Sequence, residues 1–186
     1  EISSITIPLE KEIVYKPSVT TRTVHSRLFY DDSSFADKLK VSNEAFPNYV
    51  PNARVHTFHR FIPYNKFHDD HPEYYALRNG KRLATQLCLT NEKVLGIVKD
   101  SVASFFKKND LSSVISVSQD DNTQYCMCDA CSEIDEKEGS PAGSMIYFVN
   151  KIAKSFPEKT ISTLAYQYTR KPPITKPESN VLITLC

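Results

Sequence analysis

The chain has 186 residues, a length that suits one domain or part of a larger one. Its 23 Lys and Arg residues almost balance its 22 Asp and Glu residues, so the formal net charge is +1. This balance argues against nucleic acid held by a general basic field. No apolar run approaches the ~20 residues that a membrane helix needs, so we expect no membrane span. The 4 glycines complete none of the common phosphate-cradling loops or nucleophile elbows.

The N-terminal residues 1–22 are expected to form an extended lead-in, with short strand patterns at 5–7 and 12–15 that end at prolines. A strand is predicted at 24–30. A helix is predicted to begin after the capping residues 31–34 and to end before Pro47. The chain begins with Glu1, and no signal-peptide pattern precedes the fold, so we expect a mature or trimmed product.

The middle of the chain alternates predicted strands, loops and helices. A strand is expected at 54–62, and a polar, aromatic loop follows over 64–89 that is long enough to suggest a function. Thr90 or Asn91 caps the clearest helix, whose apolar stripe runs from Val94 to Phe106. The next strand is predicted at 113–118, followed by a cysteine-bearing loop over 119–140.

The C-terminal part repeats this alternation. An apolar stripe from Met145 to Phe156 predicts a helix, strands follow at 160–166 and 181–185, and the connection 169–180 is rich in proline. Strands that alternate with helices indicate an α/β fold with a parallel sheet. Because polar residues follow the strands and the last strand leaves an apolar edge, we expect residues 23–186 to form part of a (β/α)8 TIM-barrel-like domain, with about five of its strands.

Cysteine spacing suggests a metal site. Cys126, Cys128 and Cys131 form a C-x-C-x-x-C pattern, and either Cys88 or a histidine can supply a fourth ligand. Zinc prefers four sulfur or nitrogen ligands in a tetrahedron. A disulfide between two of these cysteines and a set of reduced packing cysteines are the alternatives. A catalytic thiol is disfavoured because no motif places a histidine beside it.

Two adjacent carboxylates directly follow the strand at 113–118. Asp120 and Asp121 can divide the roles of general acid and substrate-orienting group, since burial and a neighbouring like charge raise a carboxyl pKa. Glycoside hydrolysis uses carboxylates in this way. The alternative is an ordinary turn, in which Asp120, Asp121 and Asn122 only shape the loop.

Histidine and aromatic residues gather in the strand predicted at 54–62 and in the loop that follows it. His56 and His59 lie three apart on a predicted strand and are expected on opposite faces, so only one of them can line a site. His71 and Glu73 lie in a loop rich in tyrosine, and Tyr166 ends a later strand. Aromatic faces combined with hydroxyl-binding side chains suit a carbohydrate, although the rings can equally pack beneath a surface loop.

Several motifs in order resemble a known family. They are residues 71–82, 86–91, 117–122, 125–131 and 164–166, and the likeness runs from about residue 20 to the end. Together they resemble an uncharacterised domain family (a domain of unknown function) found in multidomain proteins of glycan-degrading bacteria. That family is similar to alpha-glucuronidases and is grouped with the TIM-barrel glycoside hydrolases.

The resemblance implies a barrel, a role on complex glycans, and export to the periplasm or the cell exterior. Asp121 is the predicted acid or substrate-orienting carboxylate, with Asp120 beside it. The residues expected to contact substrate are His59, His71, Glu73, Arg82, Asn122 and Tyr166. No cofactor is expected for catalysis, and the metal expected at Cys88, Cys126, Cys128 and Cys131 is a structural zinc. Tryptophan, a common sugar platform, is absent from the chain.

Three functions remain open from the sequence. The first is a fragment of a glycoside hydrolase, in which Arg60, Lys81 or Arg82 pairs with a substrate carboxylate. The second is a non-catalytic carbohydrate-binding module on a decayed barrel. The third is a metal-stabilised structural domain without a small-molecule site.

Overall fold

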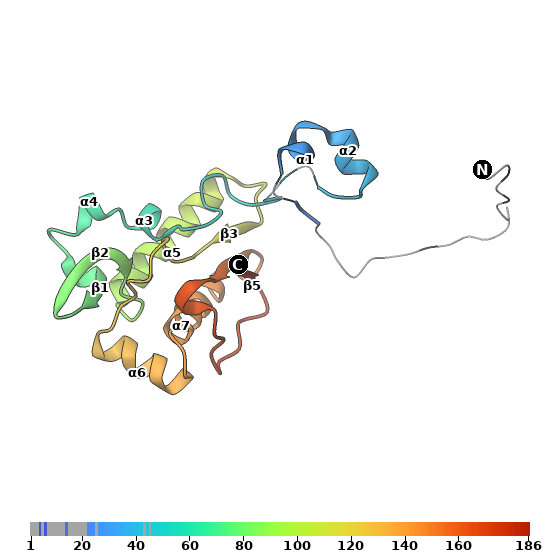
Figure 1. Cartoon of the computed structure of the whole chain (residues 1–186). Helices are drawn as coiled ribbons and strands as arrows, with labels where there is room; N and C mark the ends of the chain where they lie inside the picture. Colours follow the sequence, from blue (N-terminus) through green and yellow to red (C-terminus); the bar gives the residue numbers. More distant parts are fainter. Residues whose placement is uncertain are drawn as a thin grey trace. The chain divides into compact units, whose positions relative to one another are not determined.

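A computed structural model describes residues 4, 6, 14, 22–24, 26–42, 44 and 46–186. The chain divides into two compact units, Glu1–Pro47 and Asn48–Cys186, which are described separately (Figure 1). The strands expected at 5–7 and 12–15 lie outside the described residues, apart from Thr6 and Val14. None of the helices in the described part of the chain combines the length and apolar character needed to cross a bilayer.

The first unit contains two short helices, α1 (Arg27–Asp31) and α2 (Ser33–Lys38). The strand predicted at 24–30 is wrong, because a seven-residue pattern fits a helical turn as well as a strand. The predicted cap is confirmed, since the Asp32 carboxylate accepts a hydrogen bond from the backbone N–H of Phe35 at 3.1 Å. Helix α2 ends well before Pro47, and Lys40 then adopts the left-handed φ of 54°.

The second unit is built on a parallel sheet of three strands in the order β3 (Val114–Ser116), β4 (Thr160–Ala165) and β5 (Val181–Leu185). These strands confirm the predicted segments and the α/β class. Ser116 lies opposite Ser162, and Ser162 lies opposite Leu182. Neighbouring strands of this sheet follow one another in sequence. The sheet is smaller than the five-stranded part expected, and a closed barrel stays a prediction.

Residues 48–57 run alongside the free edge of β3. The backbone N–H of Val50 donates to Val114 O at 2.8 Å, and that of Thr57 donates to Ser118 O at 3.1 Å. The strand predicted at 54–62 is nevertheless wrong, because its second half is the helix α3 (Phe58–Phe61). A turn at 51–52 and bends at 54–55 interrupt this path, and His56, whose φ of 51° is left-handed, stands just before the helix.

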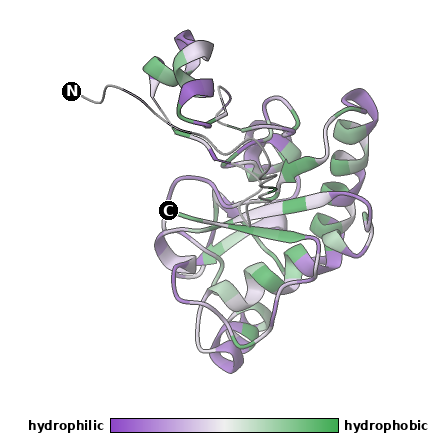
Figure 2. Ribbon diagram, turned by 90° about the vertical axis from the view of Figure 1, so that its right-hand side faces the viewer, coloured by the Kyte–Doolittle hydropathy of each residue, from purple (hydrophilic) through white to green (hydrophobic). Residues whose placement is uncertain are grey.

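Two long helices cover the sheet. Helix α5 (Glu92–Lys108) begins where Asn91 caps the backbone N–H groups of Lys93 and Val94, as predicted. Helix α7 (Ala142–Ala153) follows α6 and presents Phe148 and Val149 to the core. Ile115 and Ile161 of the sheet join the same core. The hydropathy colouring shows apolar residues on the strands and on the helix faces turned toward them (Figure 2).

The long loop predicted at 64–89 is wrong, because the segment is largely structured. It contains α4 (Tyr64–Phe67), the 3-10 turn η1 (Pro72–Tyr74) and an antiparallel hairpin of β1 (Tyr75–Arg78) and β2 (Lys81–Leu87). Asn79 and Gly80 form the hairpin turn with φ values of 49° and 73°. An Asn-Gly pair is a strong hairpin signal, since both positions of a type I′ turn need positive φ.

The loop predicted at 119–140 is also partly wrong. Its second half forms α6 (Asp129–Glu138), which ends at Gly139 in the left-handed conformation with φ 67°. Only Cys131 is buried in α6, so the helix lacks the apolar stripe from which a helix is predicted. The short 3-10 turn η2 (Gln167–Thr169) follows β4 and leads into the proline-rich connection.

Candidate functional site

Polar side chains meet where β3 and β4 end. Because parallel strands direct their carboxyl ends to the same edge of a sheet, the residues that follow them become neighbours. The Asp121 Oδ1 atom accepts hydrogen bonds from the Tyr166 hydroxyl at 3.0 Å and from Gln167 Nε2 at 3.1 Å. We call His56, His59, Asp120, Asp121, Tyr166 and Gln167 the rim residues.

Asp120 is the buried member of the rim and binds His59. Its side chain is 10% exposed, and its Oδ1 atom accepts a hydrogen bond from His59 Nδ1 at 2.6 Å. The backbone N–H of His59 donates to Oδ2 at 3.2 Å, and the Tyr64 hydroxyl donates to the same oxygen. Burial, followed by this hydrogen bond to Asp120, raises the pKa of Tyr64 well above its usual value. The carboxylate therefore has donors on both oxygens.

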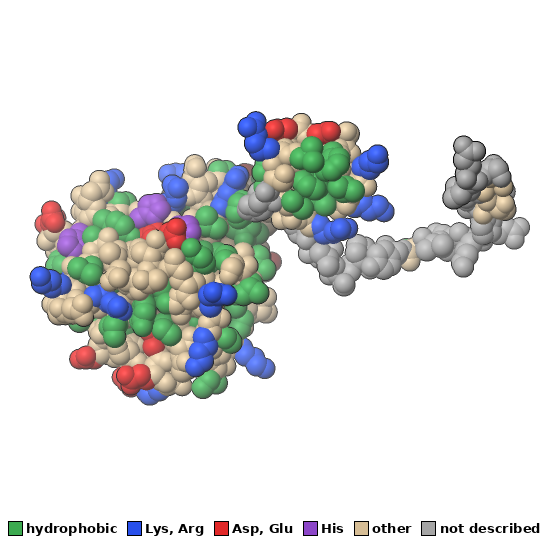
Figure 3. Space-filling model, viewed as in Figure 1, with side chains coloured by type: hydrophobic (Ala, Val, Ile, Leu, Met, Phe, Trp, Pro, Cys, Tyr) green, Lys and Arg blue, Asp and Glu red, His purple; other side chains and the backbone are tan. Residues whose placement is uncertain are grey.

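His56 reaches the same loop from residues 48–57. Its Nδ1 atom lies 2.8 Å from Gln119 O, and its ring lies 5.9 Å from the ring of Tyr166. His56 and Gln167 both adopt left-handed φ values, 51° and 49°, although neither is glycine. Such strained backbone is concentrated at functional sites, where surrounding contacts hold it in place. In the space-filling view, histidine and acidic side chains adjoin on one face (Figure 3).

Asn122 has a supporting position behind the rim. Its Nδ2 atom donates to Thr85 O at 3.0 Å, and its Oδ1 atom accepts hydrogen bonds from Gln86 Nε2 and from the backbone N–H of Gln124. Gln86 also donates to Asp120 O at 2.7 Å. The end of β2 therefore holds the loop that carries the two aspartates.

The other residues expected to contact substrate make their hydrogen bonds and ring contacts with residues outside the rim. His71 stacks on Tyr74 with ring centroids 4.6 Å apart, and its Nδ1 atom lies 3.3 Å from Glu73 Oε1. Arg82 donates to Tyr75 O at 2.8 Å and lies beside the cysteines. The structure thus brings together Asp120, Asp121, His59 and Tyr166, while His71, Glu73 and Arg82 belong to the hairpin region.

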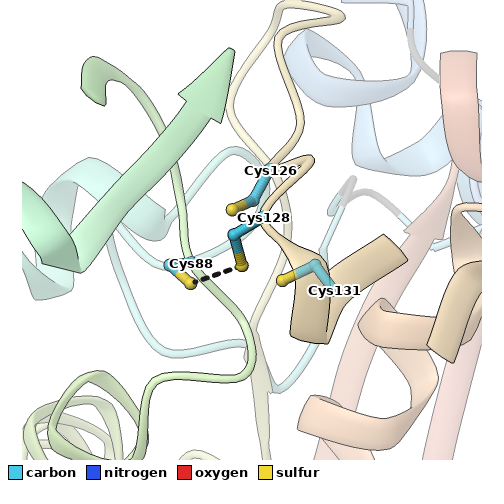
Figure 4. Close-up of side chains that lie close together, drawn as sticks. All are labelled: Cys88, Cys126, Cys128 and Cys131. Carbon is cyan, nitrogen blue, oxygen red and sulfur yellow. Dashed lines mark hydrogen bonds between the residues drawn. The ribbon is translucent and has the colours of Figure 1, made fainter. Parts of the chain in front are cut away.

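Four cysteines from three segments converge beside the hairpin (Figure 4). Cys88 directly follows β2, Cys126 and Cys128 lie in the loop before α6, and Cys131 lies in the first turn of that helix. Two backbone hydrogen bonds join the segments, from Met127 N to Leu77 O at 2.9 Å and from Cys88 N to Tyr74 O at 2.8 Å.

The sulfur geometry suits a metal ion. The four Sγ atoms lie within 4.8 Å of one another, and Cys88 Sγ lies 3.7 Å from Cys128 Sγ. A tetrahedral zinc with Zn–S bonds of ~2.3 Å separates its sulfurs by ~3.8 Å, whereas a disulfide requires ~2.05 Å. All five cysteines are described, and each of them is a free thiol. The cluster can therefore hold a metal ion.

Neighbouring groups support negative charge on the sulfurs. The backbone N–H of Leu77 donates to Cys126 Sγ at 3.4 Å, and the Arg82 guanidinium lies 4.0 Å from the same atom. The Thr90 hydroxyl lies 3.3 Å from Cys131 Sγ. Hydrogen bonds from the Cys126 and Cys131 thiols lower the pKa of Cys88. The hydrogen bonds that Cys131 makes with Cys126 and Cys88 instead raise the pKa of Cys131. A divalent cation would let all four thiols ionise together.

Some of these residues were missed by sequence reasoning. Tyr64 and Gln167 carried no motif, and Gln86 began the motif 86–91 without an assigned role, because each joins the rim through tertiary contacts with the loop at 119–122. His56 and His59 were expected on opposite faces of one strand. This was wrong, because helix α3 begins between them. The left-handed φ of Gln167 has no sequence signal, and that of His56 has only the weak enrichment of histidine in this conformation.

The fold and site define a mixed α/β protein with a polar rim at the carboxyl ends of parallel strands and a tetra-cysteine cluster that can hold a metal ion. The chain belongs to a protein family described as Domain of unknown function (DUF4838), whose model matches residues 1–186. This confirms the expected membership of an uncharacterised family. No curated protein and no solved structure matches the chain. The similarity to alpha-glucuronidases receives no support from these comparisons and stays a prediction.

Proposed function

We propose that this chain is a carbohydrate-active, glycoside-hydrolase-like domain whose ligand binds at the rim. The observation that carries the proposal is the meeting of Asp121 and Tyr166, which follow two different parallel strands, at a hydrogen-bond distance of 3.0 Å. In α/β proteins ligands bind in this position, outside the carboxyl ends of the strands. Carboxylates, imidazoles and a tyrosine ring match the hydroxyls and apolar faces of a sugar.

The barrel belongs to the same proposal. The proposal is supported by the sequential parallel strands and by the segment 48–57, which hydrogen-bonds to the outer edge of β3. At the opposite edge, β5 exposes Leu182, Ile183 and Leu185 by 46%, 42% and 80%. Edge strands with exposed apolar residues are normally paired or covered, so we propose that further strands continue the sheet there.

We propose an acidic sugar as the substrate class, because of a hollow on the segment of chain that also carries His56 and His59. An open hollow of about 300 Å³ is lined by Pro51, Asn52, Arg54, Val55 and Arg60. It lies on the same stretch of chain as His56 and His59. Guanidinium groups bind carboxylates with paired hydrogen bonds, so the hollow suits a uronic acid.

The test compares single variants of the complete protein on a panel of neutral and uronic-acid-bearing glycans. Product release and thermal shift are both recorded. We expect Asp121→Asn to lower the rate at least ~100-fold, the lower end of the contribution of a general acid. The matched control is Asp110→Asn, which changes an exposed carboxylate that accepts a hydrogen bond from the adjacent backbone N–H of Leu111. Wild-type rates in Asp121→Asn would exclude the catalytic role.

A non-catalytic carbohydrate-binding module is the second candidate. It is favoured by the ring of Tyr166, which lies beside His56 and is available as a platform. This candidate predicts glycan binding by calorimetry without turnover. Tyr166→Ala would weaken that binding, whereas Asp121→Asn would leave it unchanged. Tyr166→Phe keeps the ring and removes only the hydroxyl that donates to Asp121, so it separates the two roles of the side chain.

We propose that the metal at the cysteine cluster is a structural zinc. Four thiolates fill the tetrahedral coordination of zinc and leave no position for substrate, as in structural sites. Cys88, Cys126 and Cys131 are 4%, 5% and 1% exposed, so solvent has little access. No cofactor is proposed for catalysis.

The zinc proposal is tested by metal analysis of protein purified under reducing conditions without chelator. We expect about one zinc per chain and a lower melting temperature after chelation. Cys88→Ser should lower the zinc content, whereas Cys186→Ser, which changes an exposed cysteine outside the cluster, should not. A zinc content below about a tenth of an equivalent in the wild type would reject the proposal.

Export to the periplasm or the cell exterior is part of the proposal, because a domain that acts on large glycans must meet them where they lie. In an oxidising compartment neighbouring thiols form disulfides. A bound zinc would keep the four thiolates reduced there, so the two proposals are compatible.

A further inference from the structure

We propose that His59 is a second acid–base residue of the rim, beside Asp121, and that Asp120 is the positioning residue of His59. The inference rests on the proposed function, because it names a proton-transfer group within the same site. The juxtaposition that supports it is His59 Nδ1 at 2.6 Å from the Asp120 carboxylate, with the imidazole 43% exposed and the carboxylate 10% exposed.

The hydrogen-bond partners determine where the ring proton lies. The Asp120 carboxylate is an acceptor on both oxygens, since it also binds the His59 backbone N–H and the Tyr64 hydroxyl. His59 must therefore donate from Nδ1, and in the neutral imidazole this leaves Nε2 as the acceptor. A histidine in a catalytic triad is held in the same tautomer by its aspartate.

His56 and His68 provide contrasts within the same chain. His56 Nδ1 faces the Gln119 carbonyl at 2.8 Å, so it also carries the proton on Nδ1, but its partner is uncharged. His68 Nε2 faces the Arg82 carbonyl at 3.2 Å, so its proton lies on Nε2. Its other ring nitrogen lies 3.8 Å from Asp69. Among the histidines that the structure describes, only His59 combines an available Nε2 atom with a buried carboxylate partner.

The proton-transfer step follows from this arrangement. A hydroxyl group of the ligand or of water gives its proton to the Nε2 lone pair, and the electron pair of the O–H bond stays on the oxygen. The ring becomes an imidazolium, and its charge is compensated by Asp120 through the Nδ1–H bond. The proton returns to an oxygen in the reverse step. Asp121 remains the rim carboxylate, bonded to Tyr166 and Gln167.

The test is long-range proton–nitrogen correlation NMR of histidine-labelled protein at neutral pH. We expect His59 and His56 to be protonated on Nδ1, and His68 on Nε2. In Asp120→Asn the amide can donate to Nδ1, so the Nδ1-protonated signal of His59 should be lost while that of His56 persists. Asp110→Asn serves as the control and should change none of them. A wild-type His59 protonated on Nε2 would overturn the inference.

A chemical probe covers the case in which Asp120→Asn fails to fold. Diethyl pyrocarbonate acylates unprotonated imidazole nitrogens, so in the wild type we expect His59 to react at Nε2 faster than His68. The opposite order would contradict an available Nε2 atom. Neither measurement needs a glycan. Absence of turnover on glycans would therefore count against the proposed function alone, and a wrong tautomer against this inference alone.

Discussion

Gln167 illustrates how a single side chain ties backbone strain to the rim. Its φ is 49°, a conformation that costs an L-residue about 1–2 kcal/mol. Its Nε2 atom donates to Asp121, and its Oε1 atom is buried without a hydrogen-bond partner among the described residues. These local costs persist because the contact with Asp121 positions a carboxylate that we place in the site.

We expect Gln167→Gly to be more stable than Gln167→Ala by about 1 kcal/mol, because glycine tolerates positive φ. Both variants lose the same side-chain contacts, so the difference isolates backbone strain. The free energies of unfolding are compared by chemical denaturation. Equal stabilities would show that the left-handed conformation is not strained.

Asp120 shows how one position can be predicted in identity but not in role. The sequence placed two carboxylates after a strand, and the structure confirms that location. The division of roles depends on donors that arrive from α3 and α4, since His59 and Tyr64 both bind Asp120. Those partners lie 61 and 56 positions away in the chain, which is beyond the range of any local pattern.

Two glycines, one in a turn and one in a helix, are expected to affect stability in opposite directions. Gly80 lies in the turn between β1 and β2 with φ 73°, whereas Gly96 lies inside α5. A Cβ atom at either position would meet nothing within 4 Å. The two sites therefore differ in backbone conformation and not in the space available to a methyl group.

We expect Gly80→Ala to destabilise the protein by about 1 kcal/mol and Gly96→Ala to stabilise it by up to about 1 kcal/mol. Alanine is disfavoured at positive φ but is the best helix former. Thermal and chemical unfolding of the two variants provide the comparison. Changes of the same sign at both positions would contradict the assigned turn or the assigned helix.

The hairpin and α6 contribute to a small cluster beside the main core, although Tyr75 and Leu87 of the hairpin join the main core itself. Ala76, Cys88, Cys126 and Cys131 form this cluster, whereas the main core joins α5, α7 and the sheet. So small an apolar cluster gives little hydrophobic stabilisation. A metal ion would supply the missing cross-link between β2, the loop at 126–128 and α6.

Metal removal should therefore loosen one part of the second unit before the rest. On chelation we expect faster amide hydrogen exchange in β1, β2 and α6, and little change in β3, β4 and α7. Gln86 joins the hairpin to Asp120 and Asn122, so the rim loop should also lose protection. Re-addition of zinc should restore the protection against hydrogen exchange. Uniform exchange across the unit would show that the cluster does not stabilise a local region.

The amino-acid sequence was sufficient for the elements with strong local signals. The strands β3, β4 and β5 and the helices α5 and α7 were predicted close to their observed positions, because their apolar periodicity and the Asn91 cap are local properties. The cysteine cluster was also predicted, with Cys88 or a histidine as the fourth ligand, and the structure brings Cys88 to the other three cysteines. The Asn-Gly turn of the hairpin was present in the sequence but was overlooked.

Assembly in three dimensions was needed for the rest. Helices α3 and α6 lack a continuous apolar stripe, so contacts with other segments select their conformation. The rim forms because parallel strands end at one edge, which brings Asp121 to Tyr166 across 45 positions of the chain. Residue types and spacing therefore indicated the chemistry, whereas the pairing of His59 with Asp120 and the separation of His71 from the rim followed from long-range packing, which no local pattern encodes.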